Sequence, residues 1–170
     1  MAAVRFGREN EMLTAVRGGG HNGGGLGIGD DGLVIDLSRM KGIRVDPSAR
    51  TVRVEGGCVW ADVDHATHAF GLATPSGTVA STGVAGLTLG GGIGRLTRTY
   101  AFTIDNLLGA DVVLADGSVV RQVKRKILTS IGRFAGAATS ASLLPFCSDF
   151  SQLKWCTRAP RFGPLSRRLK

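Results

Sequence analysis

The strongest constraint on the fold comes from a run of glycines that begins at Gly18 and directly follows a hydrophobic segment, residues 12–16. That segment is predicted to be a short strand. Glycine has no Cβ and tolerates positive φ, so successive backbone N–H groups of such a loop can turn inward and line a concave anion site. The loop therefore suits a pyrophosphate, and it contains His21.

Gly18, Gly20 and Gly23 also match the glycine spacing of the Rossmann dinucleotide fingerprint. That fingerprint requires a helix that opens at its last glycine. Residues 24–29 include four further glycines, a composition that cannot sustain a helix. The sequence therefore argues against a Rossmann fold.

The rest of the chain alternates short strands with few helices, which is typical of the α+β class. A helix is expected over residues 3–9, and a second is expected between Val59 and Phe70, with Gly71 ending it as a C′ residue. Strands are expected at 32–37, 43–46, 51–55, 110–114 and 118–120.

Six blocks of sequence occur in order at 17–22, 32–38, 54–57, 71–75, 82–94 and 105–108. Together they resemble the FAD-binding, PCMH-type domain of the vanillyl-alcohol-oxidase superfamily, in its berberine-bridge-enzyme-like branch. The resemblance covers roughly residues 3–120. It implies two α+β subdomains with FAD extended between them. The domain is expected to be incomplete, because the family's first strands should precede Met1.

The resemblance assigns FAD contacts to both glycine-rich segments. Gly18, Gly19, Gly20 and Asn22 would supply backbone donors to the pyrophosphate. His21 matches a histidine that bonds covalently to the 8α-methyl group of the isoalloxazine in many members, although it could instead be an untethered hydrogen-bond donor to the phosphates. The remaining predicted contacts are Arg17, Thr82, Gly83, Gly86, Leu87, Gly90, Gly91, Gly92 and Gly94.

Other candidate residues receive structural interpretations. Val79 stands where bicovalent members carry a second tethering cysteine, so a single tether is expected, and Cys58 is expected to be a small buried residue. His65 and His68 have no evident third ligand, so no metal site is predicted. The pair Asp105 and Asn106 either hydrogen-bonds near the cofactor or ends a turn. Catalytic residues are not identified, because the substrate domain that would carry the base is expected to be absent.

The chain changes character after residue 120. Residues 1–120 hold 10 Lys/Arg against 12 Asp/Glu, whereas residues 121–170 hold 11 against one. A basic tail that binds nucleic acid would explain this charge, but no recognised motif supports one. The domains are therefore predicted as 1–120, an incomplete FAD-binding domain, and 121–170, a tail of different origin.

A displaced reading frame explains this tail better. In a frame shifted by one base, each codon joins the last base of one codon to the first two bases of the next, so alanine forces xGC and glycine forces xGG. Residues 126–146 then permit ENPDLYWALRGGGNFGVVTSF, which resembles the segment with which the family continues. We infer a one-base slip near residues 121–125 and expect a poorly ordered or loosely packed tail.

DNA sequencing across codons 118–128 tests this interpretation. It should show one inserted or deleted base relative to a frame that reads on through NFGVVTSF. Stop codons in the displaced frame within residues 126–146 would contradict the slip and would make the tail a genuine basic extension.

The expected function is that of an FAD-dependent oxidase. It would transfer hydride from a small alcohol, sugar or amine to flavin N5, with dioxygen as the second substrate, although this chain alone is expected to be inactive. A non-catalytic flavin-binding remnant is the alternative. Neither a signal peptide nor a membrane-spanning run is visible, and the three cysteines have no metal spacing, so a cytoplasmic location without membrane or nucleic-acid partners is expected.

Overall fold

The computed structural model describes residues 1–123 and 154–158, which form two sheets. The first is a small parallel pair, β1 (Thr14–Arg17) and β2 (Leu33–Asp36), in which Arg17 lies opposite Asp36. Helix α1 (Ala2–Glu9) precedes this pair, and the glycine loop connects its two strands. The first helix and both strands are therefore confirmed, with β1 beginning two residues later than predicted.

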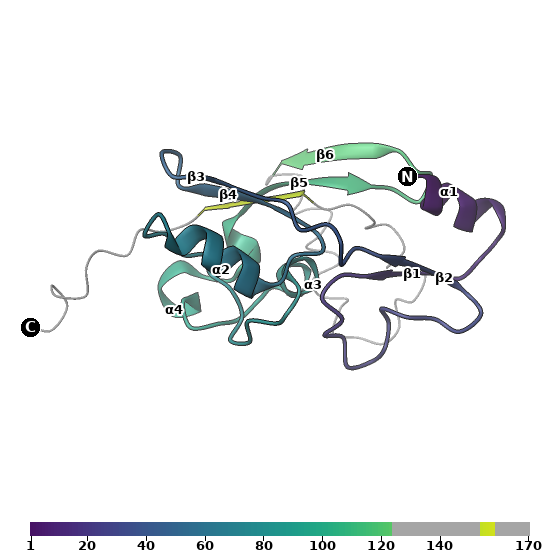
Figure 1. Ribbon diagram of the computed structural model, residues 1–170, viewed down its shortest axis with the longest axis horizontal. Helices are drawn as coiled ribbons and strands as arrows, with labels where there is room; N and C mark the ends of the chain where they lie inside the picture. Colours follow the sequence, from purple (N-terminus) through teal and green to yellow (C-terminus); the bar gives the residue numbers. More distant parts are fainter. Residues whose placement is uncertain (124–153, 159–170) are drawn as a thin grey trace, which may run out of the picture.

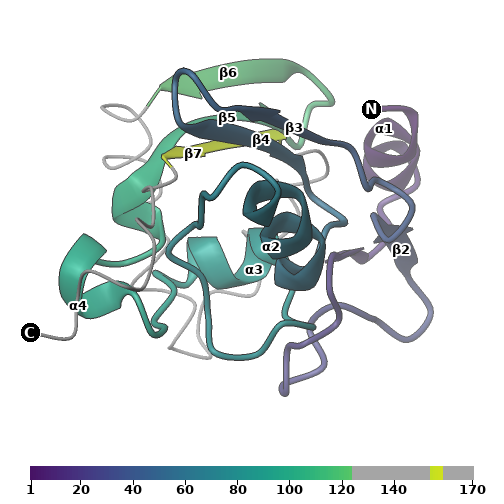
Figure 2. The same cartoon turned by 60° about the vertical axis from the view of Figure 1, so that its left-hand side comes forward.

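The larger sheet has the strand order β3-β4-β7-β5-β6 and is antiparallel in every pairing. Its strands are β3 (Ile43–Asp46), β4 (Thr51–Glu55), β5 (Leu107–Val113), β6 (Val119–Val123) and β7 (Lys154–Arg158). Strands were expected at 43–46, 51–55, 110–114 and 118–120, and the structure pairs them as the β3–β4 and β5–β6 hairpins. Figures 1 and 2 show this sheet above helices α2 (Trp60–His68) and α3 (Val84–Leu89), with the β1–β2 pair to one side. The predicted α+β class is confirmed.

Strand β7 departs from the expectation of a loosely packed tail. Its five residues pair with β4 on one side and with β5 on the other, so they lie in the interior of the sheet. An ion pair between Arg53 of β4 and Asp111 of β5 joins the two strands that flank β7. The tail expectation does not hold for residues 154–158, and the remainder of the tail lies outside the described residues.

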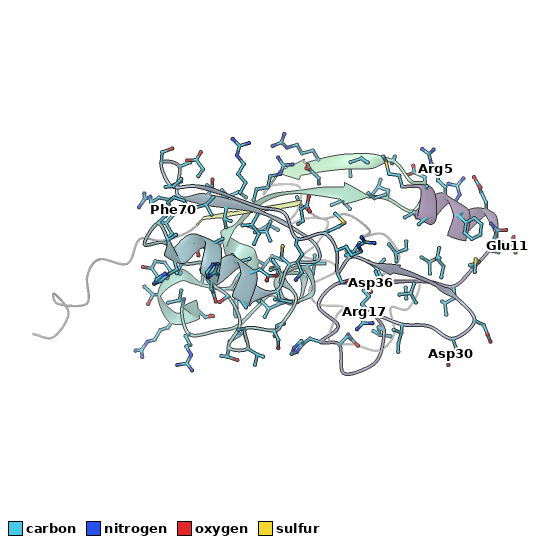
Figure 3. The ribbon with its side chains drawn as sticks, viewed as in Figure 1. Arg5, Glu11, Arg17, Asp30, Asp36 and Phe70 are labelled. Atoms are coloured by element: carbon cyan, nitrogen blue, oxygen red, sulfur yellow. The ribbon has the colours of Figure 1, made fainter. Side chains whose placement is uncertain are left out.

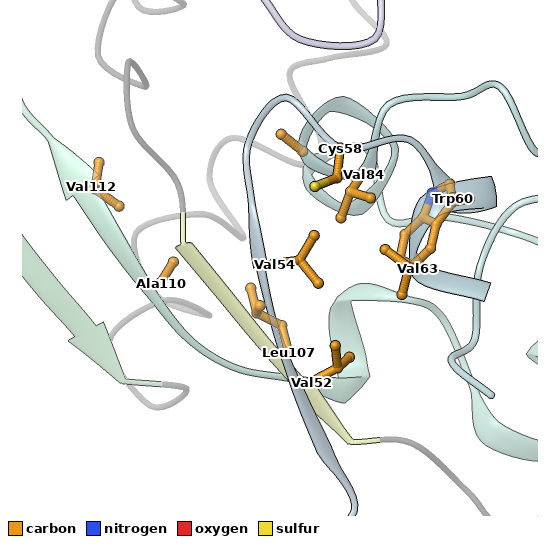
Figure 4. Packing of buried hydrophobic residues seen from close by; sticks show 10 residues of the cluster. Val52, Val54, Cys58, Trp60, Val63, Val84, Leu107, Ala110 and Val112 are labelled. Atoms are coloured by element: carbon orange, nitrogen blue, oxygen red, sulfur yellow. The ribbon is translucent and has the colours of Figure 1, made fainter. Parts of the chain in front are cut away.

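The core forms between the larger sheet and the two helices beneath it. Alternation in β4 buries Val52 and Val54 while Arg53 faces solvent, because successive side chains of a strand point to opposite faces. These valines pack with Trp60 and Val63 of α2, as Figure 4 shows. The other buried members are Cys58, Val84, Ala85, Leu107, Ala110 and Val112. The core thus fixes α2 and α3, and with them the loop between them.

Helix α3 lies inside the second glycine-rich segment, where no helix was predicted. Glycines normally disfavour helix, yet Val84, Ala85 and Thr88 are buried against the core, and this packing outweighs propensity. Two short elements follow, α4 (Thr97–Tyr100) and a 3₁₀ turn, Ile104–Asn106. Within the described residues, no helix combines the length and apolar character needed to cross a membrane.

Asp62 anchors the start of α2. Its Oδ2 accepts a hydrogen bond from the backbone N–H of Val59 at 2.9 Å. The same oxygen accepts a hydrogen bond from Nζ of Lys41 at 2.7 Å, and this contact is also an ion pair. Burial by itself raises the pKa of Asp62, but the hydrogen bonds from Lys41 and Val59 outweigh it, so the pKa lies below its ordinary value of 3.8. A lowered pKa stabilises the fold above the unfolded-state value and loses that contribution as the pH falls through the folded-state value.

We therefore expect Asp62→Ala to lower the free energy of unfolding at pH 7 by about 1 kcal/mol, the usual cost of losing a side chain that accepts a hydrogen bond at the start of a helix. The difference from wild type should shrink below about pH 4. Urea denaturation at pH 7 and pH 3 measures both values. A difference of equal size at the two pH values would contradict this role of the carboxylate.

Candidate flavin site

The first wall of the candidate site is the loop that leaves the carboxyl end of β1. Arg17 ends the strand, and Figure 3 shows it near Asp36 of β2. Hydrogen bonds from the Ser38 backbone and hydroxyl, together with the Arg17 charge, hold the pKa of Asp36 below its ordinary value. Gly20 has φ +70°, and a Cβ there would meet the Arg17 guanidinium at 3.4 Å. Glycine is thus required where the loop turns.

The backbone of this loop is available to a ligand. Among the described residues, none accepts a hydrogen bond from the backbone N–H groups of Gly19, Gly20, His21 or Asn22. Asn22 uses its side chain within the loop, because its Oδ1 accepts a hydrogen bond from the N–H of Leu26 at 3.2 Å. An exposed run of free backbone donors without bulky side chains has the chemistry that binds a phosphate group. The loop therefore fits the pyrophosphate of FAD.

The second wall is the loop that leads into α3, and it meets the first at two glycines. A Cβ on Gly19 would lie 2.4 Å from both Cα and N of Gly83, and a Cβ on Gly83 would lie 2.5 Å from N of Gly19. Gly83 is also held by a bridge to Val59, just before α2. The two predicted segments are thus in backbone contact, an approach that only glycine permits.

His21 and Ser81 form a second link between the walls. The distance from Nε2 of His21 to Oγ of Ser81 is 2.8 Å, although the residues are 60 positions apart. Both side chains are exposed beside the Gly19–Gly83 contact. Ser81 was not among the predicted site residues, because a serine between alanine and threonine carries no sequence signal of its own.

The remaining predicted contacts separate into two groups. Gly86 is exposed and its missing Cβ faces open space, so it can lie against a ligand. A Cβ on Gly92 would lie 2.2 Å from the Thr103 hydroxyl, and one on Gly94 would lie 1.8 Å from the Ser76 carbonyl oxygen. These two glycines permit close packing inside the domain.

The Leu87 side chain occupies the space that a Cβ on Gly77 or on Gly92 would take, and it packs against the core. Thr82 is half-buried, and its carbonyl oxygen accepts a hydrogen bond from the N–H of Trp60. Gly90 and Gly91 lie at the far end of α3, away from the Gly19–Gly83 contact. The structure thus brings residues 17–22 together with residues 81–83, and it separates them from residues 90–94 by the length of α3.

Cys58 and Asn106 have structural roles. Cys58 is fully buried, its Sγ faces the carbonyl oxygens of Met40 and Gly42, and burial raises the pKa of its thiol. Asn106 donates hydrogen bonds to the carbonyl oxygens of Tyr100 and Phe102, which is a turn-ending role. Val79 is exposed. In the part of the chain that the structure describes, no three His, Cys, Asp or Glu side chains gather as a metal site requires.

A separate pocket of about 390 Å³ lies beside α2. It is bordered by Asp64 and His68 of that helix, by residues 76–78, and by Arg95. No sequence pattern pointed to it, because these residues become neighbours only through the fold. His68 is exposed at its edge.

Two facing glycine loops, the first of which carries backbone donors that no described residue engages, define a nucleotide-cofactor-binding domain. The sequence profile of a family described as "FAD binding domain" matches residues 1–122. The chain therefore belongs to this FAD-binding family, and the fold is the PCMH type that the resemblance implied.

Curated relatives agree with this assignment. An FAD-linked oxidoreductase from Dictyostelium discoideum is 41% identical over 149 residues, which cover 88% of this chain and 32% of that protein. The (R)-6-hydroxynicotine oxidase of Paenarthrobacter nicotinovorans is 39% identical over 118 residues, or 69% of this chain and 26% of that protein. The chain thus spans about a third or less of the length of these relatives.

Solved structures show the same fold. The 6-hydroxy-D-nicotine oxidase of Arthrobacter nicotinovorans superposes with a TM-score of 0.80 at 30% identity, covering 94% of this chain and 33% of that one. The grass pollen allergen Phl p 4, which has glucose dehydrogenase activity, gives a TM-score of 0.81 at 27% identity over 96% of this chain and 33% of that one. A Physcomitrella patens berberine-bridge-enzyme-like protein gives 0.79 at 26%, with coverages of 93% and 33%. The structural neighbours thus include a member of the berberine-bridge-enzyme-like branch.

Proposed function

We propose that this FAD-binding domain serves an oxidase of small alcohols, sugars or amines. The observation that carries the proposal is the contact of Gly19 with Gly83 beside the free backbone donors of residues 19–22. In this arrangement the loop amides would hold the pyrophosphate, and Arg17 would add a positive charge near them. When bound, FAD supplies flavin N5 as a hydride acceptor and a route to dioxygen.

The substrate class is supported by the relatives. One is an oxidase of 6-hydroxynicotine, which is an amine, and another has glucose dehydrogenase activity. Both functions involve hydride removal from carbon bonded to nitrogen or oxygen. The base and the substrate contacts are proposed to belong to the portion that the longer relatives possess. The chain by itself is proposed to bind FAD without turnover.

His21 is proposed to attach FAD covalently through the 8α-methyl group, as the single tether. The imidazole is exposed at the junction of the two loops, where a ligand can reach it. A neutral imidazole carries one nitrogen lone pair that can act as a nucleophile. The Val79 side chain offers no nucleophile for a second bond.

Two assays test the function. The FAD-loaded chain should show a flavin spectrum that a panel of small alcohols, sugars and amines fails to bleach without oxygen, and bleaching would overturn its proposed inactivity. The gene with its displaced frame restored should yield a longer product that forms hydrogen peroxide with one of these classes. Absence of peroxide with all three would contradict the oxidase proposal.

A non-catalytic flavin-binding remnant remains the second candidate, because this chain spans only part of its relatives. It predicts the same flavin spectrum but no peroxide after frame restoration. Cytoplasmic location is also proposed, on the ground that the thiol of Cys58 is free. We propose no nucleic-acid partner.

A further inference from the structure

Ser81 is held rigidly where it meets His21. The N–H of Thr82 donates to the carbonyl oxygen of Val79 at 3.2 Å, which places Ser81 within a tight turn. The residues on both sides of Ser81 are tied to the start of α2, since the N–H of Ala61 donates to Ala80 at 2.8 Å and that of Trp60 donates to Thr82 at 3.1 Å. The Ser81 backbone is therefore fixed by the core helix.

His21 is held from the other side. Gly19, two residues before it, is packed against the backbone of Gly83. Asn22, directly after it, is fixed within the loop by hydrogen bonds to the N–H groups of Gly25 and Leu26. The contact between Nε2 and the Ser81 hydroxyl thus joins two constrained segments, and it sets the orientation of an otherwise exposed ring.

We propose that Ser81 is a positioning residue that selects the reactive nitrogen of His21. This inference rests on the proposed covalent role of His21. The proposal gives this contact one direction: Nε2–H of His21 donates to Ser81 Oγ, and the neutral ring then carries its lone pair on Nδ1. In the opposite direction Nδ1 would be protonated and the Nε2 lone pair would accept from the Ser81 hydroxyl, so this hydrogen bond would have to break before Nε2 could attack. Nδ1 is therefore the atom that bonds to the 8α carbon.

The net reaction balances with dioxygen as the oxidant. One methyl C–H bond and one imidazole N–H bond are replaced by a C–N bond between the 8α carbon and Nδ1. The two hydrogens and two electrons leave on dioxygen as hydrogen peroxide. As Nδ1 forms its bond, the ring gains positive charge, and the Ser81 oxygen stabilises Nε2–H until its proton departs.

The test follows covalent incorporation of FAD into the ligand-free full chain in air, measured as flavin fluorescence that survives denaturation. Ser81→Ala should slow incorporation by roughly tenfold or more, the cost typical of losing a group that orients an imidazole. Ser81→Thr retains the hydroxyl and should keep the wild-type rate. Ser48→Ala, at an exposed serine in the β3–β4 turn, is the matched control and should also keep it. The Kd for non-covalent FAD should change less than about threefold in all three variants.

The ring nitrogen of His21 that is bonded to the flavin distinguishes a positioning role of Ser81 from a merely structural one. A change in stability alone would not alter which nitrogen is bonded. NMR of the isolated flavinyl peptide should show the bond at Nδ1. Attachment at Nε2, or equal rates for wild type and Ser81→Ala, would overturn the proposal.

A measurement on the ligand-free chain tests the positioning role of Ser81 separately from the covalent attachment of FAD to His21. Nitrogen-15 NMR of the histidine rings, assigned with His21→Gln, should show Nε2–H for His21 in wild type and a mixture of tautomers in Ser81→Ala. If wild type binds FAD without covalent linkage, the proposed tether fails, and these spectra alone decide the positioning role. Identical ring spectra for wild type and Ser81→Ala would contradict that role.

Discussion

Gly19→Ala is expected to abolish measurable FAD binding, with affinity reduced at least about 100-fold, and to lower the free energy of unfolding by about 1–3 kcal/mol. The new Cβ would lie 2.4 Å from Cα and N of Gly83, and these backbone atoms cannot rotate away. Relief requires the two loops to separate, which also removes His21 from Ser81. Titration with FAD and urea denaturation measure the two effects.

Gly23→Ala is the matched control, because a Cβ at that position meets nothing within 4 Å. It should change neither FAD affinity nor stability appreciably. Gly83→Ala should reproduce the Gly19→Ala defect from the other side, since its Cβ would lie 2.5 Å from N of Gly19. The double variant should lose less than the sum of the two, because separating the loops once relieves both clashes. If the Gly19→Ala variant bound FAD with wild-type affinity, the Gly19–Gly83 contact would not be part of the FAD site.

His21→Ala is expected to remove covalently held flavin completely, because no other side chain that the structure describes at the loop junction offers a nucleophilic nitrogen or sulfur. Stability should change by no more than about 0.5 kcal/mol, since the imidazole is exposed. Flavin fluorescence of the denatured protein measures the tether, and FAD titration of the folded protein measures binding. Acid release of all flavin from wild type would refute the tether and leave the binding site intact.

The sequence predicts best those features that local chemistry determines. The glycine loop after β1 needs only a strand followed by residues that accept positive φ, so both were predictable from residues 12–25. The alternation of Val52, Arg53 and Val54 likewise indicates a strand with one buried face. Each of these signals lies within a few consecutive residues.

The sequence predicts less well what depends on contacts between distant segments. Gly92 and Gly94 have the same composition signal as Gly86, but Thr103 and Ser76 occupy the space that their side chains would take. Helix α3 forms because Val84 and Thr88 are buried, which outweighs the glycine content around it. Ser81 gains its significance only where the fold brings it to His21.

The origin of the tail is a prediction that the gene can decide. The family profile ends at residue 122, close to the expected slip. The match to the Dictyostelium discoideum protein extends over 149 residues and therefore runs past that point, and β7 adds a strand from residues 154–158. The end of the profile favours a displaced frame, whereas the longer match and β7 favour a tail that continues the domain. The DNA sequence across codons 118–128 decides between these two origins.

The most direct test of the central claim is titration of the ligand-free chain with FAD and, separately, with FMN, with folding verified by circular dichroism. FMN lacks the pyrophosphate and the adenylate, so it cannot satisfy the donors of residues 19–22 in the same way. The two-loop site predicts saturable FAD binding that is at least about tenfold tighter than FMN binding, because each 1.4 kcal/mol of added contact is worth a factor of ten. A folded chain that binds neither flavin, or that binds FMN as tightly as FAD, would contradict the site.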